Sequence, residues 1–158
     1  MNEIALLIAA TLNAGTVLAI AALGLLLNER AGIVNLGAEG MMLVAAVAGF
    51  ATAFHTGSDV LAFGAGAAAG ALMAAAFGLL VIWFNTNQYA TGLALSLFGA
   101  GFSAFVGIGY APEELGERAR FEIPGLADIP LLGAALFRQH PMVYIAVALT
   151  AALTWFLY

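Results

Sequence analysis

Long apolar runs separated by polar breaks dominate this chain of 158 residues. Five runs approach the roughly 20 residues that a helix needs to cross a bilayer. They cover residues 4–27, 33–54, 60–84, 89–110 and 142–158. The pattern therefore predicts an all-α fold, a polytopic transmembrane helical bundle with about five spans. We expect one membrane-spanning domain over residues 1–158, in which the stretch 111–141 is the only sizeable loop outside the membrane.

Composition extends this prediction from the separate runs to the whole chain. Apolar residues make up 64% of the sequence and charged residues 8%, against roughly 45–50% and 25% in soluble domains. The first run, 4–27, has no basic start and is longer than the 7–15 apolar residues of a secretion signal, so we interpret it as a retained helix. The lipid bilayer is then the main surrounding of the protein.

The residue types that are missing exclude several kinds of chemistry. The chain has no lysine, so it cannot form a phosphate-binding loop, and any work driven by ATP would need a partner subunit. It has no cysteine, hence no disulfide and no thiolate metal site. The net charge of −5 argues against nucleic acid as a partner. His55 and His140 lie at span ends without a second ligand at metal spacing, so we assign them no chemistry and predict no metal. The chain also has no Gly-x-Ser-x-Gly and no His-Glu-x-x-His motif, and we predict no enzyme activity and no cofactor.

The first polar segment, residues 28–43, places an amide and a carboxylate at the start of an apolar span. Asn35 and Glu39 are four residues apart, which would put them on one helical face. Gly37 and Gly40 would leave backbone groups open to a neighbouring helix or a ligand. Two interpretations remain open: an irregular helix that lines a cavity, or Glu39 placed in a first turn, where the helix dipole favours it.

The second polar segment, residues 85–95, resembles the first. Both contain the pattern Asn-x-x-Ala-x-Gly-x-x-Leu, starting at Asn35 and at Asn87, which suggests an internal repeat. Asn87, Gln88 and Thr91 offer uncharged donors and acceptors that suit a hydroxyl-rich ligand. The alternative is a polar turn whose side chains cap the fourth span.

Small residues recur at helical spacing in two spans. These are Gly66, Gly70, Ala74 and Gly78 in one, and Gly99, Ser103 and Gly107 in the other. In a membrane such stripes let helix backbones approach closely. We expect them to mark helix contacts, the alternative being that they only reflect a composition rich in Ala and Gly.

The polar segments also carry a family resemblance. Residues 29–43 are similar to the signature of ABC-importer permeases of the simple-sugar and nucleoside type, within a wider group of ribose and branched-chain amino-acid permeases. Residues 86–95 look like the second motif of that family. Its external loop is matched by 121–126 and 129–133, with Phe137 and Gln139.

The resemblance implies a permease subunit that forms a solute path for a nucleoside or simple sugar and has no catalytic residues. The candidates for that path are Asn35, Gly37, Glu39, Gly40, Asn87, Gln88 and Thr91. The resemblance further implies three partners: a second permease subunit, a cytoplasmic ATP-binding subunit and an external solute-binding protein. It places the protein in the plasma (inner) membrane of a bacterium, and it predicts that this chain is the N-terminal portion, about half, of a longer permease.

Orientation depends on which signal is followed. Three of the four arginines lie in 111–141, and by the positive-inside rule this would make that stretch cytoplasmic. The resemblance implies the opposite, and we follow it. Two other functions compete with the importer: a proton-coupled secondary carrier in which Glu39 takes up and releases a proton, and a structural membrane subunit that transports nothing.

Overall fold

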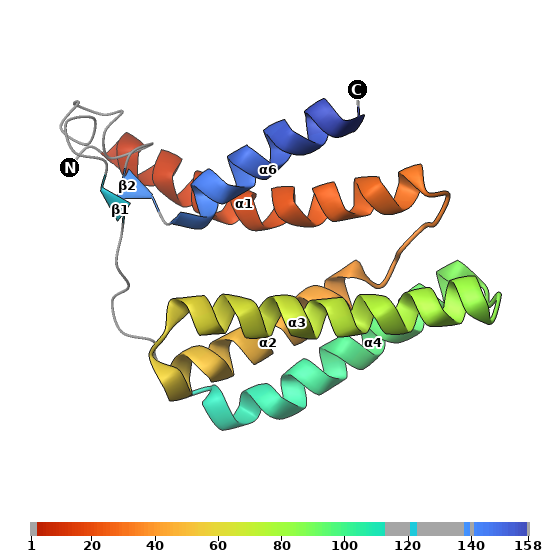
Figure 1. The fold of residues 1–158 in the computed structure, drawn as a ribbon. Coiled ribbons are helices and arrows are strands. Elements are labelled where there is room, and N and C mark those ends of the chain that lie inside the picture. The colour runs from red at the N-terminus through yellow and green to blue at the C-terminus, as the bar shows by residue number, and fades with distance from the viewer. Residues whose placement is uncertain (1–2, 113–120, 123–137, 140, 158) are drawn as a thin grey trace. The chain divides into compact units, whose positions relative to one another are not determined.

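The computed structural model describes residues 3–112, 121–122, 138–139 and 141–157. The chain divides into two compact units, and each is described by itself. Unit 1 comprises Met1–Leu26 and Glu117–Tyr158, and unit 2 comprises Leu27–Gly116. Along the chain the helices are α1 (Glu3–Arg30), α2 (Ala38–Thr56), α3 (Asp59–Gly78), the π-helix η1 (Leu79–Trp83), α4 (Gln88–Gly107), the 3-10 helix η2 (Ile108–Tyr110) and α6 (Pro141–Leu157), as Figure 1 shows.

The helices confirm the prediction of an all-α polytopic membrane protein. Within the described residues, four helical segments are long and apolar enough to cross a membrane. They are Leu7–Arg30, Ala38–Thr56, Asp59–Trp83 and Gln88–Tyr110. The fifth predicted span, 142–158, corresponds to α6, an apolar helix of 17 residues. Large side chains such as Leu97 and Phe105 are 76% and 78% exposed, as expected where lipid is the solvent.

The first predicted break, residues 28–32, is wrong in position. The helix α1 continues to Arg30, and the next helix begins at Ala38 and not at residue 33. The reason lies at Gly32, which adopts a φ of +79°. The amide of Gly32 donates to the carbonyl of Glu29 at 3.0 Å, and that of Ile33 donates to Asn28 at 2.9 Å. This pair of bonds is a Schellman motif, which ends a helix at a left-handed glycine and leaves residues 31–37 outside any helix.

The later helix ends agree more closely with the sequence. After α2, Gly57 takes a φ of +65° and donates to the carbonyl of Ala53 at 2.8 Å. Ser58 then accepts from the amide of Leu61 at the start of α3. At its other end α3 passes into the π-helix η1, a form frequent at functional sites.

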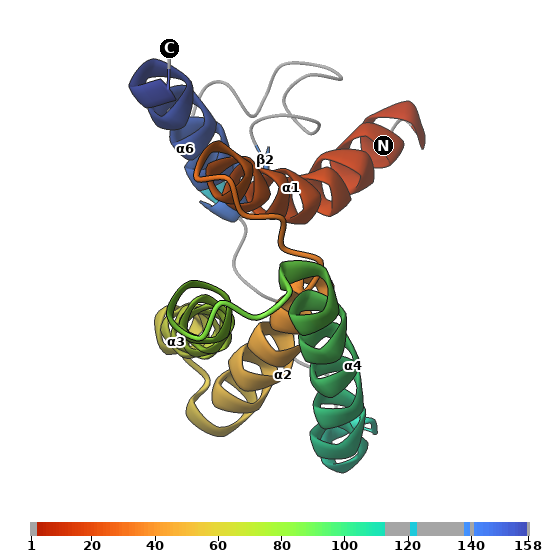
Figure 2. The same cartoon turned by 90° about the vertical axis from the view of Figure 1, so that its right-hand side faces the viewer.

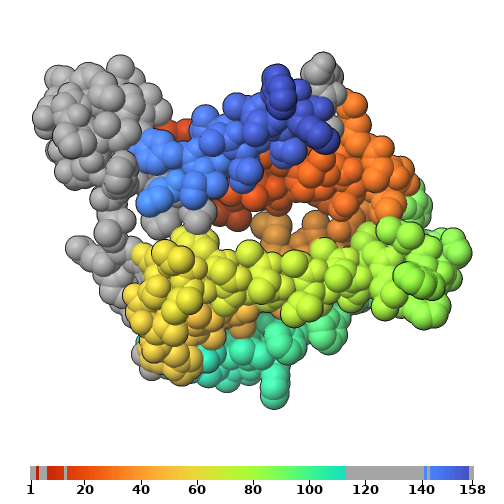
Figure 3. Space-filling view, viewed as in Figure 1, coloured from red at the N-terminus to blue at the C-terminus, as the bar shows by residue number. Residues whose placement is uncertain are grey.

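Unit 2 is organised around α2, which lies between α3 and α4 (Figure 2). Its buried core consists of Met41 and Val44 from α2 with Met73 and Phe77 from α3. In Figure 3, α3 forms the yellow to green face of this unit. The core is small because most apolar side chains point away from the helix contacts.

Small residues occupy the helix contacts of unit 2. This agrees with the predicted stripes at some of their positions and not at others. A Cβ added at Gly66 would lie 3.0 Å from the carbonyl oxygen of Ala45 in α2. A Cβ at Gly99 would overlap the backbone of Gly40. In contrast, Gly107 faces open space, and Gly78 meets only Ile82 in the continuation of its own helix. Within each stripe, therefore, only some of the small residues pack against a neighbouring helix.

The described part of unit 1 contains most of α1, α6 and a short ribbon. In α6, Val143 and Ala146 are buried. The strands β1 (Phe121–Glu122) and β2 (Arg138–Gln139) pair antiparallel, with Phe121 opposite Gln139. This ribbon lies within the stretch 111–141, which we expected to be a loop. Most of that stretch, including Phe137, lies outside the described residues.

Candidate functional site

Asn35 lies in the non-helical segment before α2 and is the buried polar residue of unit 2, with 8% of its surface exposed. Its Oδ1 accepts a hydrogen bond from the Gly37 amide at 2.9 Å, and its Nδ2 lies 3.6 Å from the sulfur of Met41. The prediction that Asn35 and Glu39 share a helical face is wrong, because Asn35 precedes the helix. Its side-chain oxygen instead accepts from the backbone amide two residues later in the chain, as Asn does in Asx turns.

Glu39 lies in the first turn of α2 and is exposed within the unit. This position agrees with the interpretation in which the positive end of the helix dipole favours the carboxylate. The α2 N-terminus has no side-chain cap from Gly37. Glu39 therefore adds negative charge at a helix start, where the first backbone amides have no carbonyl partner within the helix.

Asn87 caps α4. Its Oδ1 accepts from the amides of Tyr89 at 3.0 Å and Ala90 at 3.1 Å, and the residue is exposed. Thr91 shares a hydrogen bond of 2.8 Å with Thr86, whose hydroxyl and amide both lie within 3.2 Å of the Leu80 carbonyl in the π-helix. Asn87 thus has the capping role that was one of the two interpretations, whereas Thr86 and Thr91 join the start of α4 to the π-helix.

The two polar segments meet in what we call the junction, formed by residues 34–37 against 88–92. The amide of Val34 donates to Gln88 Oε1 at 2.9 Å. A Cβ added at Gly92 would lie 2.9 Å from the Leu36 amide nitrogen, and one added at Gly37 would lie 3.0 Å from the Gly92 carbonyl oxygen. Only glycine allows the two backbones to approach this closely.

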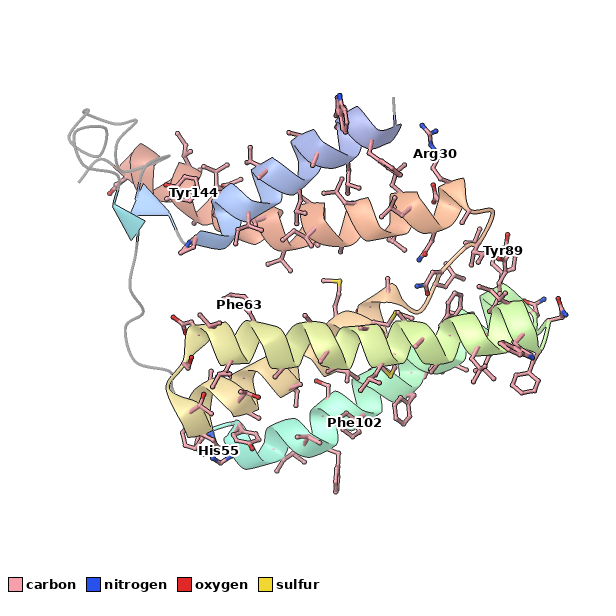
Figure 4. All side chains as sticks on the ribbon, in the orientation of Figure 1. Arg30, His55, Phe63, Tyr89, Phe102 and Tyr144 are labelled. Carbon is pink, nitrogen blue, oxygen red and sulfur yellow. The ribbon has the colours of Figure 1, made fainter. Side chains whose placement is uncertain are left out.

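One turn further along, α2 and α4 cross at Gly40. A Cβ there would lie 2.5 Å from the Leu95 carbonyl oxygen and 2.6 Å from Ser96 Cα. The structure therefore brings Asn35, Gly37, Gly40 and Gln88 together and keeps Glu39 and Asn87 at the accessible ends of their helices. Figure 4 labels Tyr89 at this end of α4.

Chemically, the junction offers the Gln88 side-chain amide, the Thr91 hydroxyl and the positive dipole ends of α2 and α4, which start at the same end of unit 2. Such groups bind polar solutes by hydrogen bonds. Among the residues the structure describes, no group of three or more His, Cys, Asp or Glu could hold a metal ion.

A family comparison then decides what kind of protein carries this junction. Residues 7–158 match the model of the branched-chain amino acid transport system / permease component family. The chain belongs to this permease family. This confirms the resemblance seen in residues 29–43 and 86–95, and it agrees with the expectation that the chain is not itself an enzyme. It is a multi-pass membrane protein.

Three curated relatives of this permease match nearly its whole length. The putative glucose ABC transporter permease protein TsgC13 of Haloferax volcanii is 41% identical, over 100% of this chain and 49% of its own length. The guanosine ABC transporter permease protein NupQ of Bacillus subtilis is 29% identical, over 98% and 52%. The nucleoside ABC transporter permease protein NupC of Lactococcus lactis is 26% identical, over 99% and 52%. The chain spans about half the length of these relatives, and no solved structure matches it.

One contact of the permease was missed by the sequence, which gave His55 no role. At the far end of α2, His55 Nε2 lies 3.0 Å from the hydroxyl of Tyr110 in η2; Figure 4 labels His55 there. The rings of Phe50 and Phe54 meet Tyr110 edge to face. The order of the spans already pointed to this contact. The helices α2 and α4 are the first and third of three consecutive spans, so they run in the same direction. Their C-terminal ends, which carry His55 and Tyr110, must then lie on one membrane face.

Proposed function

We propose that this chain is part of the membrane-spanning permease of an ABC importer that takes up a nucleoside or a simple sugar. The family match over residues 7–158 supports the permease role. The names of the relatives, which specify glucose, guanosine and nucleoside, support these solute classes. The main structural support for the proposal is the junction. There the hydrogen bond between Val34 and Gln88 joins the two polar segments at the starts of α2 and α4.

In this proposal the permease works with three partners. A second permease subunit completes the membrane pathway, and an external solute-binding protein delivers the solute. A cytoplasmic ATP-binding subunit hydrolyses ATP, because this chain has no lysine for a phosphate-binding loop. The assembly lies in the plasma (inner) membrane of a bacterium.

The candidate residues divide into two roles. Glu39 and Asn87 are exposed, Gln88 and Thr91 are half-buried, and these four can meet solute or water. Asn35, Gly37 and Gly40 are buried and hold the backbone of the junction in place. We propose that solute passes the junction along the first group, where the neutral side chains of Asn87, Gln88 and Thr91 bind sugar hydroxyls beside the Glu39 carboxylate.

Uptake by the reconstituted importer tests this function. Full-length permease with its partner subunits is placed in proteoliposomes, and uptake of radiolabelled guanosine, glucose and ribose is measured with and without ATP on the cytoplasmic side. We expect uptake of at least one solute that requires ATP. Uptake driven by a pH gradient without ATP would contradict the proposal.

Glu39→Gln separates the importer from the proton-coupled carrier. The substitution preserves size and hydrogen-bonding groups but removes the titrating proton. An ABC importer should keep ATP-driven uptake, whereas a carrier that protonates Glu39 should lose transport. A structural subunit would show no uptake that depends on any junction residue.

Orientation has its own test. Single cysteines at Thr86 and at Gly116 are labelled with an impermeant maleimide in intact cells and in inverted vesicles. We expect Gly116→Cys to react from outside and Thr86→Cys from the cytoplasm. The reverse pattern would favour the arginine count over the family resemblance.

A further inference from the structure

A cavity of about 410 Å³ opens in unit 2 at the end opposite the junction. It is lined by Ala46, Val47 and Phe50 from α2 and by Gly107, Tyr110 and Ala111 from the end of α4 and η2. Cavities of roughly 300–1,000 Å³ are the usual size of small-molecule sites. The lining residues combine one aromatic wall, formed by the contacting rings of Phe50 and Tyr110, with the small residues Ala46, Gly107 and Ala111 beside it.

The cavity exists because α2 and α4 are close at one end only. Gly40 and Gly99 bring the two backbones into contact near the junction. Figure 2 shows the helices diverging from that crossing, and no glycine pair closes them again. Where they have separated, Phe50 and Tyr110 occupy the facing positions.

Tyr110 is held in a fixed position. Its ring centroid lies 6.0 Å from Phe50, 5.8 Å from Phe54 and 5.9 Å from His55, all edge to face. Its hydroxyl also bonds to His55 Nε2 at 3.0 Å. A phenol oxygen has one donor and further acceptor capacity, so one polar group remains available to a ligand. An aromatic wall fixed in advance loses little entropy when a ligand binds.

We propose that this cavity is an entry site for a nucleoside, in which the planar base packs against Phe50 and Tyr110 and hydrogen-bonds the Tyr110 hydroxyl. The inference rests on the proposed function and narrows its solute class. Every base presents an aromatic face. Among the described lining residues Tyr110 supplies the only polar side chain, so the cavity offers an aromatic surface more than hydrogen bonds, which favours a planar base over a hexose.

The location of the cavity agrees with an entry role. The 19 residues of α2 span about 28 Å at 1.5 Å per residue, close to the roughly 30 Å of a bilayer core. On α2 the lining residues Ala46 and Phe50 lie about 12 and 18 Å from Ala38, so the cavity extends from the middle of the span toward the membrane face opposite the junction. In the proposed orientation the cavity faces the outside, where solute arrives, and the polar junction faces the cytoplasm.

Protection of a cysteine provides a direct test that needs no transport. Ala46→Cys is introduced into the full-length permease; this chain contributes no native cysteine. Labelling by a maleimide is measured in the purified assembly with guanosine or with glucose. We expect guanosine to slow labelling and glucose to have no effect. Three results would overturn the proposal. Guanosine and glucose could protect equally, or neither could protect. The cysteine could also fail to react at all, because another part of the permease fills the cavity.

Uptake kinetics give a second test with a matched control. Tyr110→Leu should raise the KM for guanosine about tenfold, the effect expected from losing one base–aromatic stack, while Tyr110→Phe should lose less. Phe102→Leu is the control, since Phe102 stacks on Phe98 and does not line the cavity. An unchanged KM in Tyr110→Leu, or an equal rise in the control, would refute the site.

The uptake assay also distinguishes failure of the site from failure of the importer function. ATP-dependent uptake of glucose alone would refute the nucleoside site and leave the importer function intact. No ATP-dependent uptake by the unmodified assembly would refute the importer itself.

Discussion

The two polar segments of unit 2 use the same residue in different surroundings. Asn35 Oδ1 accepts from one backbone amide, that of Gly37, and is buried. Asn87 Oδ1 accepts from two, those of Tyr89 and Ala90, and is exposed. Water can replace Asn87 but has little access to Asn35. The same local hydrogen bond therefore matters more for stability where the other segment covers it.

The shared sequence pattern has a structural counterpart in this comparison. Its glycine is Gly40 in the first segment and Gly92 in the second. A Cβ at Gly40 would run into Leu95 and Ser96 of α4, and one at Gly92 would run into Leu36 and Gly37. The glycine of each copy thus packs against residues in or next to the other copy of the pattern. Close packing at the junction explains both glycines, whichever solute the permease carries.

Breaking the helix crossing below the junction should have the largest effect. Gly99→Ala places a methyl group into the Gly40 backbone, and backbone cannot move aside as a flexible side chain can. We expect a loss of about 3 kcal/mol, the upper part of the usual range for overpacking. Thermal unfolding of the purified permease in detergent measures it.

Gly101→Ala is the matched control, because a Cβ there meets nothing within 4 Å. This substitution should leave stability unchanged or raise it by roughly 0.5–1 kcal/mol, since alanine favours the helix. If both variants lost stability equally, the crossing at Gly99 would not be the cause.

Removing the two asparagines compares the segments directly. Asn35→Ala leaves the Gly37 amide buried without its partner, which costs about 2 kcal/mol. Asn87→Ala removes an exposed cap at about 1 kcal/mol. We expect membrane abundance and unfolding temperature to fall further for Asn35→Ala. A larger loss for Asn87→Ala would show that burial is not what distinguishes the two segments.

The bond between the segments can be removed separately. Gln88→Ala leaves the Val34 amide without its acceptor and should cost about 1 kcal/mol. Gln88→Glu keeps an oxygen at the same place and should retain most of the stability. Unfolding temperatures of the two variants, measured side by side, check this. Equal losses would indicate that the Gln88 side chain contributes by packing and not by accepting this bond.

Asn87→Ser should have the smallest effect on stability, because serine also accepts from the first amides of a helix and differs from asparagine by only a few tenths of a kcal/mol. Abundance and ATP-driven uptake should be measured together. If both stay near normal, Asn87 is a cap and nothing more. If abundance stays normal and uptake falls, Asn87 contacts the solute, which would sharpen the proposed path.

Sequence alone determined the helical membrane fold, because crossing a bilayer requires long apolar runs and their lengths are a local property. It also placed the caps at Gly57, Ser58 and Asn87 within the predicted breaks. The family match covers residues 7–158, which include the two polar segments that the sequence singled out.

Tertiary structure decided which of these residues meet. The Schellman motif at Gly32 is a local signal that ends α1, but the non-helical residues between it and Ala38 also pack against α4, through the bond from Val34 to Gln88. The bond between Val34 and Gln88 spans 54 positions, and the contact of His55 with Tyr110 spans 55. No local pattern encodes such pairs, since they depend on the angle at which α2 and α4 cross. That angle is set by which glycines face each other, and only the packed helices reveal it.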